Sequence, residues 1–303
     1  MKKFILFLFI VVVIGLTGYF VYAGDYLSRF SQPASAELKV HFIDVGQGDA
    51  ILIDYGPAEV LIDGGDKGSG VWKYLKSYVD GDLEAIVATH THADHIGGLI
   101  DVLAEYKVDE IWLNGDTSTS TTYQNFVNAV NIEGSAIYRA TLGNVIKAGD
   151  LQLTVLNPPK QLFPDANNNS IVLRLDFGEV AFLFMGDAEA EAEEAILNQT
   201  VVPLGDIEIL KVGHHASRTA STVAFLSVIS PDLAIYMAGK GNVYGHPHME
   251  TLVNLYETGA RIFGTDVHGT IMVSTDGKTY HFYVQKQAPM IVPSVSVSEM
   301  SSS

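Results

Sequence analysis

The chain has 303 residues, of which 48% are hydrophobic and 17% charged, and a formal net charge of −17. This composition excludes a disordered chain and predicts a folded protein with a sizeable core. The acidic balance argues against a surface that coats nucleic acid, because clustered Lys and Arg bind phosphate backbones. It leaves open a phosphate-bearing substrate held by metal cations. Because the chain has no cysteine, any metal site must use His, Asp, Glu or Asn.

Residues 1–23 are predicted to be a transmembrane anchor or a signal segment. Two lysines precede the apolar run Phe4–Ala23, which has about the length that a helix needs to cross a bilayer. The length favours a retained anchor, whereas the small residues Ala34–Ala36 offer a cleavage pattern somewhat far downstream. Residues 24–37 read as a linker. We therefore expect an extracytoplasmic protein that is membrane-anchored or secreted.

One domain is expected over residues 38–287, followed by a disordered tail at 288–303 that is rich in Ser, Val and Pro. The strand-like runs are Leu38–Val45, Ala50–Tyr55, Glu59–Asp63, Glu84–Thr89, Asp109–Leu113, Leu151–Leu156, Ser170–Phe177, Val180–Met185, Ile207–Val212, Leu233–Met237, Arg261–Thr265, Thr270–Ser274 and Tyr280–Val284. The helical runs are Val71–Val79, Gly97–Tyr106, Thr122–Val130, Ala188–Leu197, Thr222–Val228 and Met249–Glu257. This mixture indicates an α/β fold in which helices cover two sheets.

The densest chemistry follows a buried strand, in the segment His90-Thr91-His92-Ala93-Asp94-His95. Imidazole and carboxylate together suit zinc, and also manganese or iron. His90 and His92 alternate, so both rings can face one ion while Asp94 and His95 face a second. A solvated polar turn is the alternative, but the strand before and the helix after favour a metal site.

Two later strands also end in ligand-type side chains. Gly186-Asp187 follows one strand, and Gly213-His214-His215 follows another. An Asp after Gly is often only a turn residue. Adjacent histidines at the exit of a buried strand are costly unless they are bonded or bind a metal.

These segments together resemble the metallo-β-lactamase superfamily, and within it the branch related to the extracytoplasmic hydrolase domain of the ComEC competence proteins. The motifs that carry the narrower resemblance are Phe42–Ala50, Leu61–Gly65, Asn168–Ser170, Lys211–Ser217 and Tyr244–His248. The resemblance spans essentially the whole domain. It implies a four-layer αββα metallo-β-lactamase sandwich.

The resemblance also implies a site for two divalent metal ions, Zn or Mn. His90 and His92 would bind one ion, Asp94 and His95 the other, and Asp187 would bridge them. One of the paired histidines, by preference His215, would complete the coordination of the second ion, with His246 as the alternative. Asp63 would orient a ligand imidazole.

One departure concerns the third histidine that many members of the superfamily supply to the first ion. This chain has Asn167-Asn168-Asn169 in that region, and we assign Asn169 to the surroundings of the metals or substrate. An amide oxygen is a poorer zinc ligand than imidazole but acceptable to manganese.

The catalytic candidates are Asp94, His214 and His246, with Ser217 and His248 as further substrate-side residues. His246 and His248 lie in a loop with Gly and Pro, for which a solvent-exposed turn is the alternative. We expect a metal-dependent hydrolase that acts on a phosphodiester, with single-stranded DNA as one candidate substrate and a role in DNA uptake. A cell-envelope phosphodiester, a phosphocholine ester or a lactone is the alternative substrate. A binding module without turnover is the third hypothesis. The run Lys211–Arg218 is the slender basic feature in favour of a nuclease.

Overall fold

The computed structural model describes residues 37–199, 202, 204–205 and 207–293. The predicted membrane segment 1–23 and the linker up to residue 36 lie outside this described part. Within the described ranges, no helix combines the length and the apolar character needed to span a bilayer. The described residues from Leu38 onward belong to one compact unit.

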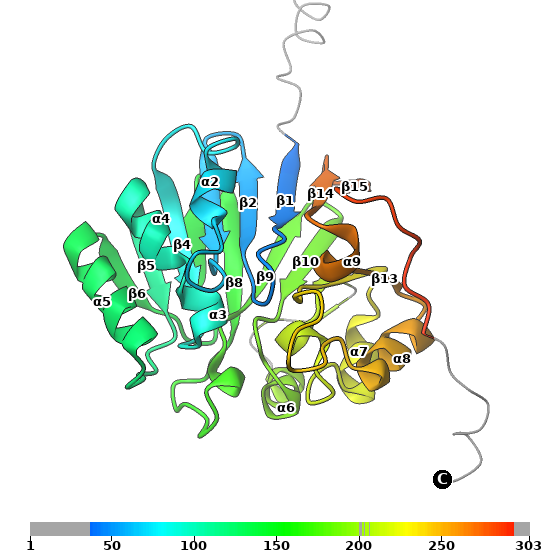
Figure 1. Cartoon of the computed structure of the whole chain (residues 1–303). Coiled ribbons are helices and arrows are strands. Elements are labelled where there is room, and N and C mark those ends of the chain that lie inside the picture. The colour runs from blue at the N-terminus through cyan, green and yellow to red at the C-terminus, as the bar shows by residue number, and fades with distance from the viewer. Residues whose placement is uncertain (1–36, 200–201, 203, 206, 294–303) are drawn as a thin grey trace, which may run out of the picture. The chain divides into compact units, whose positions relative to one another are not determined.

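Two sheets form the centre of this unit (Figure 1). The strands of the eight-stranded sheet are, in order, β15 (Tyr280–Val284), β14 (Ile271–Thr275), β1 (Leu38–Phe42), β2 (Ile51–Tyr55), β3 (Ala58–Ile62), β4 (Leu83–Ala88), β5 (Val108–Leu113) and β6 (Ala136–Arg139). The strands of the seven-stranded sheet are β13 (Arg261–Gly264), β12 (Leu233–Tyr236), β11 (Ile209–Lys211), β10 (Val180–Phe184), β9 (Val172–Phe177), β8 (Leu151–Asn157) and β7 (Val145–Ala148). Each sheet is antiparallel on one side and parallel on the other, and β3 to β6 and β10 to β13 are the parallel parts.

The central strands are buried on both faces, which explains their nearly continuous apolar sequences. In β10, Phe182 and Phe184 point into the core between the two sheets, while Ala181 and Leu183 point to the outer face of the same sheet. β4 alternates in the same way between Val87 on the inside and Ile86 on the outside. The strand period of two therefore places every second side chain in a different core.

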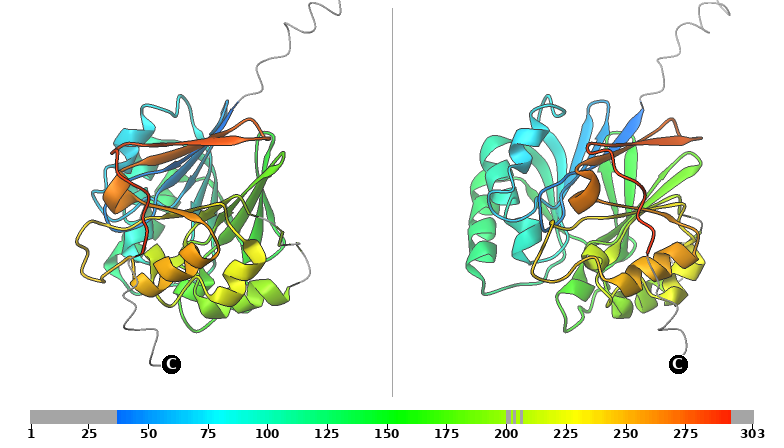
Figure 2. Two further views of the ribbon diagram at one scale, coloured as in Figure 1. Left: turned by 90° about the vertical axis from the view of Figure 1, so that its right-hand side faces the viewer. Right: turned by 45° about the vertical axis from the view of Figure 1, so that its right-hand side comes forward.

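Helices cover both outer faces, as the two further views show (Figure 2). The helices α2 (Val71–Leu75), α3 (Ala93–Ile96), α4 (Leu99–Glu105) and α5 (Thr121–Glu133) pack on the eight-stranded sheet. The helices α6 (Ala190–Asn198), α7 (Val223–Ile229) and α8 (Met249–Glu257) pack on the seven-stranded sheet. The observed layers confirm the predicted αββα sandwich.

Three short elements complete the described part, namely η1 (Asn167–Asn169), η2 (Gly213–Ala216) and α9 (Thr265–His268). The sequence did not predict β6, β7, α3 or α9. In β6 all four side chains are exposed, so this edge strand has no alternating apolar pattern to detect.

The domain extends past the boundary predicted at residue 287. Ile291 forms an antiparallel bridge with Ile262 in β13, and its N–H donates to the Ile262 carbonyl at 3.0 Å. His268 Nε2 contacts the Pro289 carbonyl at 3.1 Å. Residues 288–293 are therefore not part of a disordered tail, because backbone pairing that the sequence pattern does not reveal holds them. The remainder of the predicted tail, 294–303, lies outside the described residues.

Candidate metal centre

Glycines bring the loop after β3 into contact with the histidine motif. The Gly64 N–H donates to the His95 carbonyl at 2.7 Å, and the Gly98 N–H donates to the Gly65 carbonyl at 2.9 Å. A Cβ atom on Gly98 would collide with the Gly64 backbone. The two glycines that follow the motif are thus needed for this close approach, which places Asp63 behind the motif.

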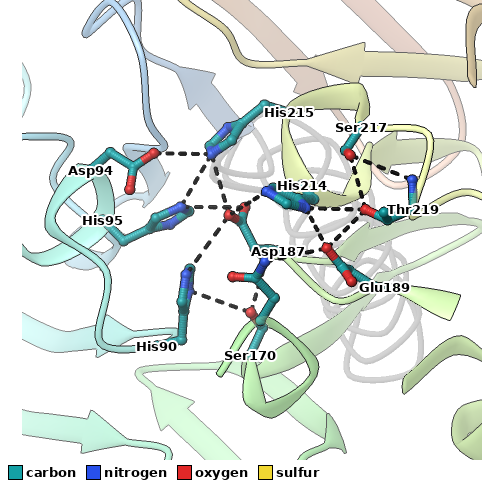
Figure 3. Close-up of polar contacts among 12 residues, drawn as sticks. His90, Asp94, His95, Ser170, Asp187, Glu189, His214, His215, Ser217 and Thr219 are labelled. Carbon is teal, nitrogen blue, oxygen red and sulfur yellow. Dashed lines mark hydrogen bonds and ion pairs between the residues drawn. The ribbon is translucent and has the colours of Figure 1, made fainter. Parts of the chain in front are cut away.

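The ligand-type side chains converge from the ends of three strands (Figure 3). β4 leads into the motif, β10 leads into Asp187, and β11 leads into His214 and His215. Because β10 and β11 are parallel neighbours, their carboxyl ends lie at the same edge of the sheet.

The first of two donor groups contains His95, Asp187, His215 and Asp49, whose ligand atoms lie within 4.8 Å of one another, and Asp94 lies against its His215 ring. His95 Nε2 lies 3.3 Å from His215 Nε2 and 3.3 Å from Asp187 Oδ1. His215 Nε2 lies 3.3 Å from both Asp187 Oδ2 and Asp94 Oδ2. Ligands at 2.0–2.1 Å from a tetrahedral ion are roughly 3.3 Å apart. These side chains therefore fit a single divalent ion.

The second donor group consists of His90, His92 and Asp187, whose ligand atoms lie within 4.8 Å of one another. His90 Nε2 is buried, has no hydrogen-bond partner, and lies 3.8 Å from Asp187 Oδ2. Burial lowers the pKa of His90 well below its usual value, which keeps the imidazole neutral. Since buried polar atoms are normally paired, a neutral, unpaired ring nitrogen here indicates a metal ligand.

Asp187 belongs to both groups. Burial raises the pKa of its carboxyl, but the lowering by His215 and His95 is larger than this effect. The pKa of Asp187 therefore lies well below the usual value. Asp187 is therefore a carboxylate placed between the two donor groups, as a bridging ligand would be.

Asp63 lies behind His95. Its carboxylate is fully buried, accepts from the Thr89 N–H at 2.8 Å and the Thr89 hydroxyl at 2.7 Å, and contacts His95 Nδ1 at 2.7 Å. A proton on Nδ1 leaves the Nε2 lone pair of His95 facing Asp187 and His215. This is the arrangement by which carboxylates orient ligand histidines.

A second support, which the sequence did not predict, lies behind His215. The Asp49 carboxylate is buried, and its Oδ1 lies 3.3 Å from His215 Nδ1. The same ring nitrogen contacts the Met237 carbonyl at 2.9 Å. The fully buried Lys211 ammonium pairs with Asp49 and donates to the Gly186 carbonyl at 3.0 Å. Lys211 therefore adds nothing to a basic surface, although the sequence offered it as evidence for a nuclease. The sequence signal that could have predicted this Lys211–Asp49 pair is the single lysine at the end of an otherwise apolar strand.

His214 turns the other way from His215 and faces a chain of polar side chains (Figure 3). Its Nδ1 contacts Glu189 Oε1 at 2.7 Å and the Thr219 hydroxyl at 3.3 Å. The Thr219 hydroxyl donates to Glu189 at 2.8 Å and lies 2.9 Å from the Ser217 hydroxyl. His214 Nε2 lies 3.7 Å from Asp187 Oδ2. Glu189 therefore fixes the His214 ring with Nε2 toward the donor groups. Ser217 contacts His214 only indirectly, through the Thr219 hydroxyl.

A cavity of about 360 Å³ opens over the donor groups. Its lining residues are Gln47, His92, Ala93, Asp94, Asn167, Asp187, His214, His215, Tyr244 and His246. The His246 ring centroid lies 5.3 Å from that of His214 and 6.0 Å from that of His215. Burial, together with the neighbouring histidines, lowers the pKa of His246 to about 4. His246 is therefore a neutral ring at the wall of the cavity, whereas His215 lies among the carboxylates.

The profile of the Metallo-beta-lactamase superfamily matches residues 41–240, which include every donor named above. The chain belongs to this superfamily. Its members are metal-dependent hydrolases, in agreement with the buried cluster of His and Asp donors.

The relatives of this chain include competence and recombination proteins. ComE operon protein 3 of Bacillus subtilis is 32% identical over 257 residues, covering 78% of this chain and 33% of the relative. Recombination protein 2 of Haemophilus influenzae is 29% identical over 251 residues, covering 81% of this chain and 30% of the relative. The chain thus spans about a third of the length of these relatives. Among solved structures, the metallo-beta-lactamase fold protein YhfI from Bacillus subtilis has a TM-score of 0.50 at 14% identity, covering 75% of this chain and 96% of that one.

The asparagine run is placed differently from its prediction. Asn169 is buried away from the cavity, where its amide bonds Asp116 and the Phe163 backbone. Asn167 lines the cavity, and its Oδ1 is buried without a partner. A 3₁₀ turn points consecutive side chains in different directions, so the sequence could not show which asparagine faces the donor groups.

His248 also lies apart from the cavity lining. Its Nδ1 accepts from the Arg218 N–H at 3.1 Å, and its own N–H donates to the Ala216 carbonyl at 2.9 Å. It therefore fastens the His246 loop to the loop that carries His215. Four residues of the site were not predicted: Gln47 and Tyr244 line the cavity, and Asp49 and Glu189 contact His215 and His214.

Proposed function

We propose that the protein is a phosphodiesterase with two divalent metal ions. His90 and His92 would hold one ion, Asp94, His95 and His215 would hold the other, and Asp187 would contribute to both. The single observation that carries this proposal is that Asp187 is shared by two donor groups. Zinc and manganese are the two candidate metals, because Asn167 lines the cavity and an amide oxygen suits manganese better than zinc.

The residues around the donors have distinct tasks in this proposal. Asp63 and Asp49 orient His95 and His215 from behind. His214 directs Nε2 toward the cavity, where it hydrogen-bonds a phosphoryl oxygen. His246 donates a hydrogen bond on the leaving-group side. When bound, two divalent ions supply an activated water at neutral pH and neutralise phosphoryl charge.

Single-stranded DNA is the substrate that the names of the competence relatives favour. Against a long polymer stands the cavity itself, because no Lys or Arg is among the described residues that line it. A smaller exported phosphodiester, a phosphocholine ester or a lactone is therefore the second candidate. In either case we place the reaction outside the cytoplasmic membrane, with residues 1–23 as anchor or signal.

The decisive experiment measures metal content and phosphodiester turnover on the same preparations of the full chain. Two ions per chain and turnover that stops in Asp187→Asn are expected. Glu191→Gln, an exposed carboxylate on α6, is the matched control and should change neither quantity. Metal uptake without hydrolysis of any phosphodiester, lactone or β-lactam would instead support a binding module.

A further inference from the structure

Tyr244 is an exposed aromatic side chain at the cavity that the proposed chemistry does not use. It lines the cavity although 61% of it remains exposed. Its ring is stacked on that of His246, with centroids 5.7 Å apart and an interplanar angle of 22°. One face of the phenol is therefore backed by imidazole.

The loop that carries Tyr244 joins β12 to α8 (Figure 2, yellow to orange), and the Asn242 side chain braces it. Asn242 Oδ1 accepts from the Tyr244 N–H at 3.1 Å and the His246 N–H at 3.0 Å. Its Nδ2 donates to the carbonyls of Gly239 at 2.9 Å and His246 at 2.5 Å. Such bracing fixes the ring before a ligand arrives, which lowers the entropic cost of binding.

The cavity wall also carries polar atoms that lack partners. Gln47 Nε2, Asn167 Oδ1 and His246 Nδ1 are buried and form no hydrogen bond. Gln47 uses its Oε1 to accept from the Gly239 N–H at 3.2 Å, at the base of the Tyr244 loop. An unpaired donor and acceptor beside an aromatic face are suited to a flat ligand with polar edges.

We propose that Tyr244 is a stacking platform for a planar ring attached to the phosphate, and so a specificity-determining residue of this cavity. This inference rests on the proposed phosphodiesterase function and narrows its substrate class. Quaternary ammonium groups such as choline are recognised by cages of several aromatic rings. Among the described lining residues, Tyr244 alone contributes an aromatic ring other than imidazole. A single backed face favours stacking of a base instead.

The test uses calorimetric binding to the metal-loaded full chain, with thymidine 5′-monophosphate, phosphocholine and inorganic phosphate as probes. Stacking contributes on the order of 5- to 150-fold in affinity per base. The wild type should therefore bind thymidine monophosphate at least ~5-fold more tightly than inorganic phosphate. Tyr244→Ala should remove this preference without changing the affinity for inorganic phosphate, and Tyr244→Phe should keep it. Val243→Ala is the control, because Val243 is 92% exposed on the same loop and should keep the preference.

Three results would overturn the platform: an unchanged preference in Tyr244→Ala, a preference for phosphocholine that this variant loses, or an equal loss in Val243→Ala. Failure of the phosphodiesterase itself looks different, since no diester would be hydrolysed. In that case thymidine monophosphate binding that Tyr244→Ala abolishes still supports the platform, and its absence in the wild type overturns it.

Discussion

The Lys211 ammonium and the Asp49 carboxylate form a fully buried ion pair directly behind the His215 ring. Asp49 Oδ1 lies 3.3 Å from His215 Nδ1, and Lys211 also donates to the carbonyl of Gly186, the residue before Asp187. The pair thus connects the two strand ends that carry His215 and Asp187, and it fixes both without facing the cavity.

Lys211→Met should destabilise the protein by up to about 3–5 kcal/mol, because the buried Asp49 carboxylate loses its lysine partner and keeps only the contact with the His215 ring. The double variant Asp49→Asn with Lys211→Met should recover part of this loss. Urea unfolding of the metal-free protein measures both. Lys76→Met is the control, because Lys76 and Glu105 form an exposed pair worth about 0–1 kcal/mol. Similar losses in both lysine variants would contradict the role given to the buried pair.

Asp63→Asn should weaken metal binding by about 10- to 100-fold, because the carboxylate that orients His95 is replaced by a neutral amide. Competition with a chelator of known affinity gives the dissociation constants. Asp66→Asn, in the exposed part of the same loop, should bind metal like the wild type. An unchanged affinity in Asp63→Asn would mean that Thr89 and the loop alone fix His95.

Metal affinity should rise with pH through neutrality. Burial lowers the pKa of His95 and His215, but the carboxylates around them, above all Asp187, raise it by more than burial lowers it. Both pKa values therefore lie well above the usual range. The metal-free protein therefore holds protons on these rings that a metal must displace. Calorimetric zinc titrations in buffers of different ionisation enthalpy should show proton release, with affinity rising up to about tenfold per pH unit for each proton.

The same shifts predict the stability of the metal-free protein. A histidine whose folded pKa is raised contributes stability that is complete below its unfolded pKa of about 6.5 and is lost as pH rises through the folded value. The contribution of His95 and His215 should thus decline on the alkaline side of neutrality. Denaturant midpoints measured without metal from pH 6 to 9 test this sign, and a midpoint that rises throughout would oppose it.

Asp94→Ala and His246→Ala should differ in metal content. Asp94 Oδ2 lies 3.3 Å from His215 Nε2, so its loss should remove an ion and abolish hydrolysis. His246 lies at the cavity wall, and its loss should lower turnover by ~10²–10⁴-fold with both ions retained. Elemental analysis and turnover on the same samples separate the two effects. Loss of an ion from His246→Ala would make His246 a ligand.

The sequence by itself determined the residue types available as metal donors, the layers and the family resemblance. Alternation of apolar residues and the position of His90–His95 after a strand follow from local periodicity, which the chain must obey wherever it folds. Absence of cysteine limited the donors to His and carboxylates. The sequence pattern did not reveal edge strands such as β6, because their exposed side chains show no periodic alternation of apolar and polar residues.

Only the tertiary structure decided which residues meet. The choice of His215 rather than His246 as the partner of Asp94 depends on how β11 and the loop after β12 approach the other sheet. A backbone turn decides that Asn167 rather than Asn169 faces the cavity. The burial of Lys211 depends on Asp49, a residue distant in sequence. These relationships are long-range contacts, and local sequence patterns carry information only about neighbours within one strand or helical turn.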